Sequence, residues 1–123
     1  MKDGPNTITI DDVEYVRKDA AYEPAAKLDG LAYVIVRSES AGVFAGYLEQ
    51  RDGGEAILRE ARRIWYWAGA ASLSQLASSG TSKPEECKFP CAVRSITVMG
   101  VIEVIPCTEQ ARTSIAAVTV WQV

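Results

Sequence analysis

The chain of 123 residues contains no histidine, and this absence removes several kinds of chemistry at once. Triads and dyads that need an imidazole base are excluded, and so are metal sites built on histidine. The sequence also lacks a P-loop, a Gly-x-Gly-x-x-Gly fingerprint and a Gly-x-Ser-x-Gly motif. Carboxylate or lysine chemistry stays open, but no paired carboxylates fall on a pocket-forming element. We therefore expect no catalytic residues and no enzymatic activity.

Cysteine is scarce as well: the chain has only Cys87, Cys91 and Cys107. An odd number of cysteines without a secretion signal indicates reduced thiols. A structural zinc site needs four ligands, which three cysteines and no histidine do not supply. The sequence therefore predicts no metal site, and nothing in it calls for a cofactor.

Long apolar runs and charge of one sign are also missing. No segment approaches the ~18 apolar residues of a membrane span, and the first residues lack the apolar core of a signal peptide. The net charge of −3 lies entirely in residues 1–29, and residues 30–123 are neutral. Without a basic stripe, we expect neither a nucleic acid polymer nor a membrane as partner. The expected location is the cytoplasm.

The residue pattern predicts a single α+β domain at residues 30–123, preceded by an acidic hairpin and connector at residues 1–29. A mainly antiparallel β-sheet carries two short α-helices, and the N-terminal β-hairpin is an appendage. The hairpin is expected at Thr7–Ile10 and 13–17, around a turn at Asp11-Asp12. The uninterrupted apolar run at 31–36 predicts a strand buried on both faces, and Asp52-Gly53-Gly54 predicts a hairpin turn. Further strands are expected at 43–51, 91–98, 101–105 and 118–123, with helices after Ser72 and Thr108.

The stretch from residue 55 to residue 67 is ambiguous. Residues 55–63 fit a helix or a strand, while the aromatic and β-branched residues of Ile64–Trp67 favour a strand. In a strand, Arg63, Trp65 and Trp67 would share one face, and Arg62, Ile64 and Tyr66 the other. Two guanidiniums beside several aromatic rings are what a nucleotide-like ligand needs, since arginine binds phosphate and aromatic faces stack on bases.

The same run has a purely structural interpretation. The aromatic residues can form a core strand, and Arg62 and Arg63 can pair with Glu49, Glu55 or Glu60 on adjacent strands.

Several longer segments carry a family resemblance: residues 40–49, residues 61–77 with the core Arg-Arg-Ile-Trp-Tyr-Trp-Ala-Gly-Ala-Ala-Ser, Cys87-Lys88-Phe89-Pro90, and residues 102–109. Over residues 31–123 the chain resembles a family of short phage and prophage proteins that carry only a domain-of-unknown-function label. This family is identified with the phage anti-Thoeris sponge proteins, which sequester cyclic ADP-ribose-type immune signals.

The resemblance implies a function and a site. It implies sequestration, without cleavage, of a glycosyl-cyclic ADP-ribose-type signal or a cyclic oligonucleotide, in the host bacterial cytoplasm, to block anti-phage defence. It also implies a homodimer or higher homo-oligomer with pockets between subunits. Arg62 or Arg63 would meet phosphate, Phe89 or Trp65 would stack on a base, and Arg112 would be a second phosphate contact. The candidate ligand-binding residues are Arg62, Arg63, Trp65, Lys88, Phe89 and Arg112.

Other interpretations of these residues stay open. Phe89 can simply anchor its loop, and Arg112 can be a solvated helix residue. The alternative function is that of a small phage accessory or structural protein whose Arg/Trp patch binds another protein.

Overall fold

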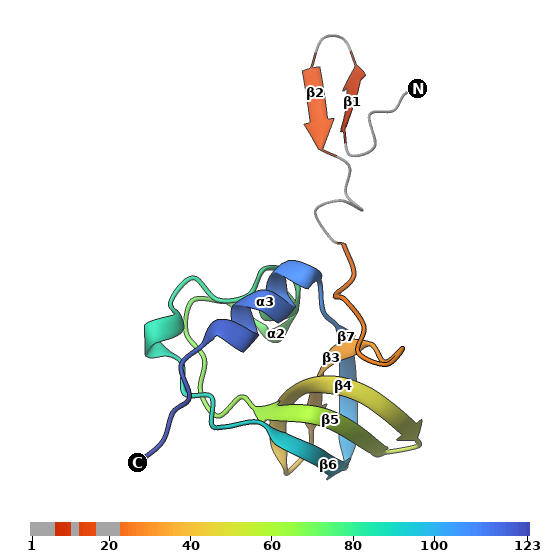
Figure 1. The fold of residues 1–123 in the computed structure, drawn as a ribbon, viewed down its shortest axis with the longest axis vertical. Helices are drawn as coiled ribbons and strands as arrows, with labels where there is room; N and C mark the ends of the chain where they lie inside the picture. Colours follow the sequence, from red (N-terminus) through yellow and green to blue (C-terminus); the bar gives the residue numbers. More distant parts are fainter. Residues whose placement is uncertain (1–6, 11–12, 17–22) are drawn as a thin grey trace.

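A computed structural model describes residues 7–10, 13–16 and 23–123, and it shows the expected α+β fold (Figure 1). The elements are β1 (Thr7–Ile10), β2 (Val13–Val16), β3 (Tyr33–Ser38), β4 (Gly42–Asp52), β5 (Glu55–Arg63), α2 (Leu73–Ser79), the 3₁₀ helix η1 (Pro84–Glu86), β6 (Val93–Met99), β7 (Val101–Pro106) and α3 (Glu109–Ala117). Within these segments, no helix has the length and apolar character needed to cross a membrane.

The main sheet has five antiparallel strands in the order β6-β5-β4-β3-β7. Strands β6 and β7 are consecutive in the chain but lie at opposite ends of this order, with only Gly100 between them. The sheet must therefore curl until its two edges meet. Gly100 makes this turn with a φ of 69°, and its carbonyl accepts a 2.8 Å hydrogen bond from the Glu39 amide.

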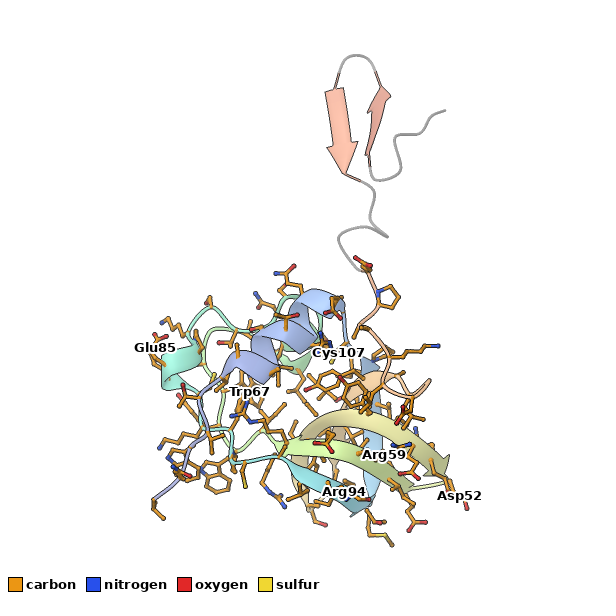
Figure 2. The ribbon with its side chains drawn as sticks, in the orientation of Figure 1. Asp52, Arg59, Trp67, Glu85, Arg94 and Cys107 are labelled. Carbon is orange, nitrogen blue, oxygen red and sulfur yellow. The ribbon has the colours of Figure 1, made fainter. Side chains whose placement is uncertain are left out.

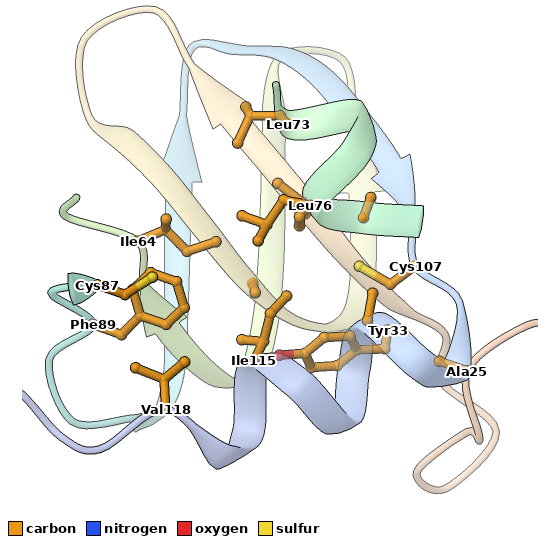
Figure 3. Packing of buried hydrophobic residues seen from close by; sticks show 14 residues of the cluster. Ala25, Tyr33, Ile64, Leu73, Leu76, Cys87, Phe89, Cys107, Ile115 and Val118 are labelled. Carbon is orange, nitrogen blue, oxygen red and sulfur yellow. The ribbon is translucent and has the colours of Figure 1, made fainter. Parts of the chain in front are cut away.

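The curled sheet is packed on both faces. Its outer face carries α2 and α3, and the cluster between sheet and helices includes Ile35, Leu76, Phe89 and Ile115 (Figure 3). Its inner face encloses a second cluster, which includes Val34, Val36, Phe44, Leu58 and Val98. Consecutive residues of β3 alternate between the clusters, so its uninterrupted apolar run is buried on both faces, as the sequence predicts.

Both helices begin where their capping residues predict. The Ser72 hydroxyl accepts from the Gln75 amide, and the Gln75 side chain accepts in return from the Ala71 amide. At α3, the Thr108 side chain accepts from the Ala111 amide at 3.0 Å. Thr108 also donates to the Ser78 carbonyl, and this bond ties the start of α3 to the end of α2.

Residues 55–63, which fit a helix or a strand by sequence, form strand β5. Two other strand predictions are wrong. Ile64–Trp67 do not continue that strand. The Ile64 amide still donates to the Val43 carbonyl of β4, but the next two amides turn away to the Lys88 carbonyl, and Tyr66 forms an isolated bridge to Lys88. Residues 118–123 form no strand either. Val120 makes a single parallel bridge to Phe89, and the following Pro90 has no amide with which to extend a ladder.

At the N-terminal end, β1 and β2 form the expected antiparallel hairpin. The turn predicted at Asp11-Asp12, the last residue of the predicted second strand (Arg17) and residues 18–22 of the connector lie outside the described residues. The rest of the connector packs on the main domain: Ala25 belongs to the helix-side core, and its amide donates to the Cys107 carbonyl. The packed domain therefore begins before the predicted boundary at residue 30.

Gly80→Ala should destabilise the fold strongly. Gly80 ends α2 with φ 78° and ψ −158°, a conformation that is essentially restricted to glycine, and an added Cβ would meet the Ser114 side chain. We expect a loss of about 3 kcal/mol in the free energy of unfolding, from backbone strain and overpacking together. Gly53→Ala is the matched control, because its φ is also positive (58°) but its surroundings are open; it should cost only ~1 kcal/mol. Chemical denaturation measures both variants, and equal losses of unfolding free energy in Gly80→Ala and Gly53→Ala would contradict a role for the contact with Ser114.

Candidate ligand-binding cleft

A cleft of about 300 Å³ opens between the outer face of the sheet and α3. Tyr33 of β3, Tyr47 of β4, and Glu60 and Arg62 of β5 line its sheet side. Arg112 of α3 and the segment that follows α3 line the opposite side. We call this site the Arg112 cleft.

An irregularity in β5 creates the sheet side of this cleft. Tyr47 pairs with Arg59 and Ala45 pairs with Arg62, so the single residue Gly46 lies opposite both Glu60 and Ala61. This is a β-bulge, and Glu60 adopts a left-handed φ of 49° within it. In a regular strand Leu58 and Arg62, four residues apart, would share one face. The extra residue shifts this alternation, so that Leu58 faces the inner core and Arg62 faces the helix side.

Gly46 is the partner that allows the bulge to form. A Cβ on Gly46 would lie 3.0 Å from the Arg59 carbonyl oxygen and 3.1 Å from the Ala61 Cα. The absence of a side chain at position 46 therefore makes room for the extra residue on β5.

Arg62 is buried, and backbone carbonyls hold its guanidinium. Nε donates to Pro90 at 2.9 Å, Nη1 to Ile115 at 2.8 Å, and Nη2 to Phe89 at 3.1 Å and to Val118 at 2.6 Å. Ile115 and Val118 stand at the C-terminal end of α3, where the helix dipole favours a cation. Burial lowers the pKa of Arg62, but a guanidinium stays charged in proteins. Arg62 thus adds positive charge to the cleft, and no carboxylate in the described segments forms an ion pair with it.

Arg112 is held by Glu109, one turn earlier on α3. Its Nε and Nη2 donate to the two carboxylate oxygens of Glu109, and Nη1 takes no part in this pair. The same carboxylate accepts from the Ala26 amide at 2.6 Å. The hydrogen bond from Arg112 lowers the pKa of Glu109 to about 2, and the hydrogen bond to Glu109 raises the pKa of Arg112. Arg112 is therefore charged and oriented before any ligand arrives.

Two tyrosines complete the polar lining. The rings of Tyr33 and Tyr47 meet edge to face, with centroids 5.0 Å apart. Burial raises the pKa of Tyr33 well above its usual value, so its hydroxyl stays protonated at neutral pH. The cleft therefore combines two guanidiniums, two tyrosine side chains and the carboxylate of Glu60, a set of groups that can bind an anion which also carries hydrogen-bond donors.

The structure divides the predicted site residues between two places. Arg62 and Arg112 meet in the Arg112 cleft, whereas Arg63 lies on the other face of β5 with its guanidinium 4.4 Å from the centre of the Phe44 ring. Arg63 donates to the Ala41 carbonyl and lines a second cleft with Trp65 and Trp67. Figure 2 shows Trp67 at the base of the helical layer, where it packs against the helix-side core.

Trp65 and Lys88 belong to an aromatic stack on the surface. The Trp65 indole is 62% exposed and lies parallel to that of Trp121, with centroids 6.3 Å apart. The Lys88 ammonium lies 5.6 Å from the Trp121 ring centroid. Neither Trp65 nor Lys88 lines the Arg112 cleft.

The expected role of Phe89 requires correction. Its side chain is 0% exposed and packs in the helix-side core beneath Arg62, so no face of the ring is open to a base. Phe89 anchors its loop, which was the structural alternative. The suggested ion pairs of Arg62 and Arg63 are also wrong for the described residues, because Glu49 pairs with Arg59 and both arginines bond to carbonyls.

Sequence reasoning did not identify Tyr33, Tyr47 or Glu60 as candidate site residues. The apolar pair Leu58 and Ala61 does carry a signal: two inward-facing positions three residues apart break the period of two and indicate a bulge between them. The tyrosines carry no such signal, because each is an ordinary strand residue by type.

Comparisons with known proteins give one match. The model of a family described as a domain of unknown function, DUF6948, matches residues 31–115. Neither the curated proteins nor the solved structures contain a significant match to the chain.

Arg62→Met should reduce the free energy of unfolding by about 3 kcal/mol or more, because it leaves buried carbonyls without donors. Arg62→Lys should recover only part of this loss, since an ammonium cannot reproduce the planar fork. Arg63→Met is the matched control; Arg63 is exposed, and its loss should cost under about 1 kcal/mol. Chemical denaturation measures all three variants, and equal effects at positions 62 and 63 would contradict the assigned role of Arg62.

The pair of Glu109 and Arg112 should make stability depend on pH in the acid range. The folded-state pKa of Glu109, about 2, lies below its ordinary value of 4.5, so the ionised carboxylate stabilises the fold above pH 4.5. This contribution should disappear as the pH falls from about 4.5 to about 2. In thermal denaturation, the difference between the wild type and Glu109→Gln should therefore shrink across this window. The difference in melting temperature between the wild type and Arg112→Gln should shrink across the same window. A difference that stays constant with pH would count against the pair.

Proposed function

The chain belongs to the DUF6948 family of domains of unknown function, and from the Arg112 cleft we propose that it binds a cyclic nucleotide signal and retains it without cleavage. One observation carries this proposal: Arg112 and Arg62 converge on a single cleft that also holds two tyrosines. Arginine clusters of this kind bind phosphate through charge-assisted hydrogen bonds.

In this proposal Arg112 makes the direct phosphate contact. Glu109 fixes Nε and Nη2, and the Tyr47 hydroxyl also contacts the guanidinium; we place the ligand oxygen at Nη1, which takes no part in the pair with Glu109. Arg62 acts differently, because four carbonyls already occupy its guanidinium. It contributes an electrostatic field, which is strong in a partly desolvated site because the local dielectric constant is low.

The size of the cleft determines how much of a ligand it can enclose. A volume of about 300 Å³ lies at the lower end of the ~300–1,000 Å³ typical of small-molecule sites. It suits the sugar-phosphate part of a cyclic nucleotide rather than the whole molecule. A second copy of the chain would cover the remainder, in agreement with the pockets between subunits that the family resemblance implies.

The chemistry of three groups supports retention without cleavage. Glu109, with its pKa near 2, is ionised at neutral pH and has no proton to give to a leaving group. Cys107 is buried, and burial raises its pKa to about 12, so it is not a thiolate nucleophile. The chain has no histidine to act as a base.

The biological role that fits this binding mode is sequestration of an immune signal. The sequence segments described above resemble phage anti-Thoeris sponges, whose ligands are cyclic ADP-ribose-type molecules. We extend the proposal accordingly: the protein is phage-encoded, acts in the host bacterial cytoplasm as a homo-oligomer, and removes the signal by binding it.

A second candidate function rests on the aromatic stack. Trp65, Tyr66 and Trp121 are all exposed and lie beside Lys88, and tryptophan and tyrosine are frequent anchors of protein interfaces. A small accessory protein that binds another protein through this patch would need no ligand in the Arg112 cleft.

Calorimetric titration with cyclic ADP-ribose tests the first proposal. Arg112→Ala should weaken binding about tenfold to a hundredfold, the value of a hydrogen bond to a charged group. Arg112→Lys should restore little of this affinity, because an ammonium cannot replace the fork-shaped guanidinium. Heat denaturation of the complex should release the ligand chemically intact.

The control for Arg112→Ala is Arg51→Ala, which removes the same charge beside Asp52 at the tip of the β4–β5 hairpin (Figure 2). It should leave the affinity unchanged. A wild-type protein that binds neither cyclic ADP-ribose nor a cyclic oligonucleotide would overturn the proposal and favour the interaction protein. A cleaved product whose formation depends on the protein would overturn retention.

A further inference from the structure

Glu60 occupies a backbone conformation that favours glycine. Its φ of 49° places a residue with a long side chain in the left-handed region, at an energetic cost that glycine would avoid. Strained residues of this kind persist where the surrounding structure fixes them, and they concentrate at binding sites. Here the bulge fixes the backbone, and Glu60 lines the Arg112 cleft.

The carboxylate of Glu60 has no structural task among the residues that the structure describes. No hydrogen bond or ion pair from those residues reaches it, whereas the nearby acids Glu49 and Glu109 pair with Arg59 and Arg112. A carboxylate accepts hydrogen bonds and donates none. Glu60 is exposed, so water solvates its carboxylate in the free protein; a ligand that covers Glu60 while its acceptors bind Arg112 would need donors to replace that water.

We propose that Glu60 accepts hydrogen bonds from ribose hydroxyls of the ligand whose phosphate binds Arg112, so that the cleft selects ribonucleotides over their deoxy analogues. This inference rests on the proposed function and adds a specificity-determining residue to it. A ribose phosphate carries phosphate acceptors and hydroxyl donors within one sugar unit, which matches a cleft of about 300 Å³. Carboxylates bind ribose hydroxyls in the same way in dinucleotide sites.

The base is the less suitable donor for Glu60. A base would need a flat apolar face to stack on, but Tyr33 is buried and meets Tyr47 edge to face. The cleft therefore offers polar groups suited to a sugar phosphate and no open aromatic platform of its own.

The test varies the residue at position 60 and the ribose hydroxyls of the ligand, and it measures each affinity by calorimetric titration. Wild type, Glu60→Gln and Glu60→Ala are each titrated with cyclic ADP-ribose and with analogues that each lack one ribose hydroxyl. For the wild type, at least one analogue should bind about tenfold to a hundredfold more weakly than the parent. This penalty should fall below about tenfold in Glu60→Gln and vanish in Glu60→Ala, because a neutral acceptor makes a weaker bond than a charged one.

The outcomes separate the two proposals. A wild type that binds no cyclic nucleotide overturns the proposed function, and this inference falls with it. A wild type that binds the parent and every deoxy analogue equally overturns the inference alone. Tighter binding of all ligands by Glu60→Gln, with unchanged ratios, would mean that Glu60 only repels phosphate, which also overturns it.

Two further variants exclude indirect effects. Glu85→Gln makes the same change of charge on η1, away from Arg59 and the strand that carries Glu60 (Figure 2), and it should change neither affinity nor selectivity. Glu60→Gly should raise the melting temperature, because it relieves the left-handed backbone, while it abolishes selectivity for the hydroxyl. A stabilised Glu60→Gly that keeps full selectivity would show that the side chain has no part in recognition.

Discussion

The buried guanidinium of Arg62 is the interaction on which the rest of the domain depends. It joins β5 to the loop at Phe89-Pro90 and to the end of α3, and these segments lie far apart in the sequence. Because its partners are carbonyl dipoles rather than carboxylates, the guanidinium keeps its net charge. The same contacts therefore close the outer layer and leave a positive field at the cleft beside it.

The orientation of Arg62 depends in turn on a local event in the sheet. Without the extra residue Glu60, alternation from Leu58 would turn position 62 into the inner core, where a cation has no partner. The bulge needs Gly46 opposite it, since a Cβ there would press on the β5 backbone. The absence of a side chain at Gly46 of β4 thus determines which face of β5 carries the charge of Arg62, and the bulge residue Glu60 lines the same cleft.

Local signals in the sequence predicted the fold well. Ser72 and Thr108 marked the helix starts, the apolar run of β3 indicated burial on both faces, and the Asp52–Gly54 turn placed a hairpin. The site was predicted only in part, because Arg62 and Arg63 are identical by type and adjacent. Which of them enters the core depends on a bulge, and bulges depend on packing across strands. Phe89 was misjudged for a similar reason, since its burial depends on the distant Ile115 and Val118.

The segment after α3 gives the cleft a property that a rigid pocket lacks. Val120 lines the Arg112 cleft, and the chain beside it is held by one backbone bond, from the Trp121 amide to the Phe89 carbonyl, and by the stack on Trp65. This part of the wall therefore depends on contacts of Trp121 that lie outside the cleft, including the one with the Lys88 ammonium. Affinity is then scaled by the fraction of molecules in which this wall is in place, because an apparent dissociation constant equals the intrinsic constant divided by that fraction. The aromatic stack, which lies outside the cleft, would then influence the concentration at which the cleft fills.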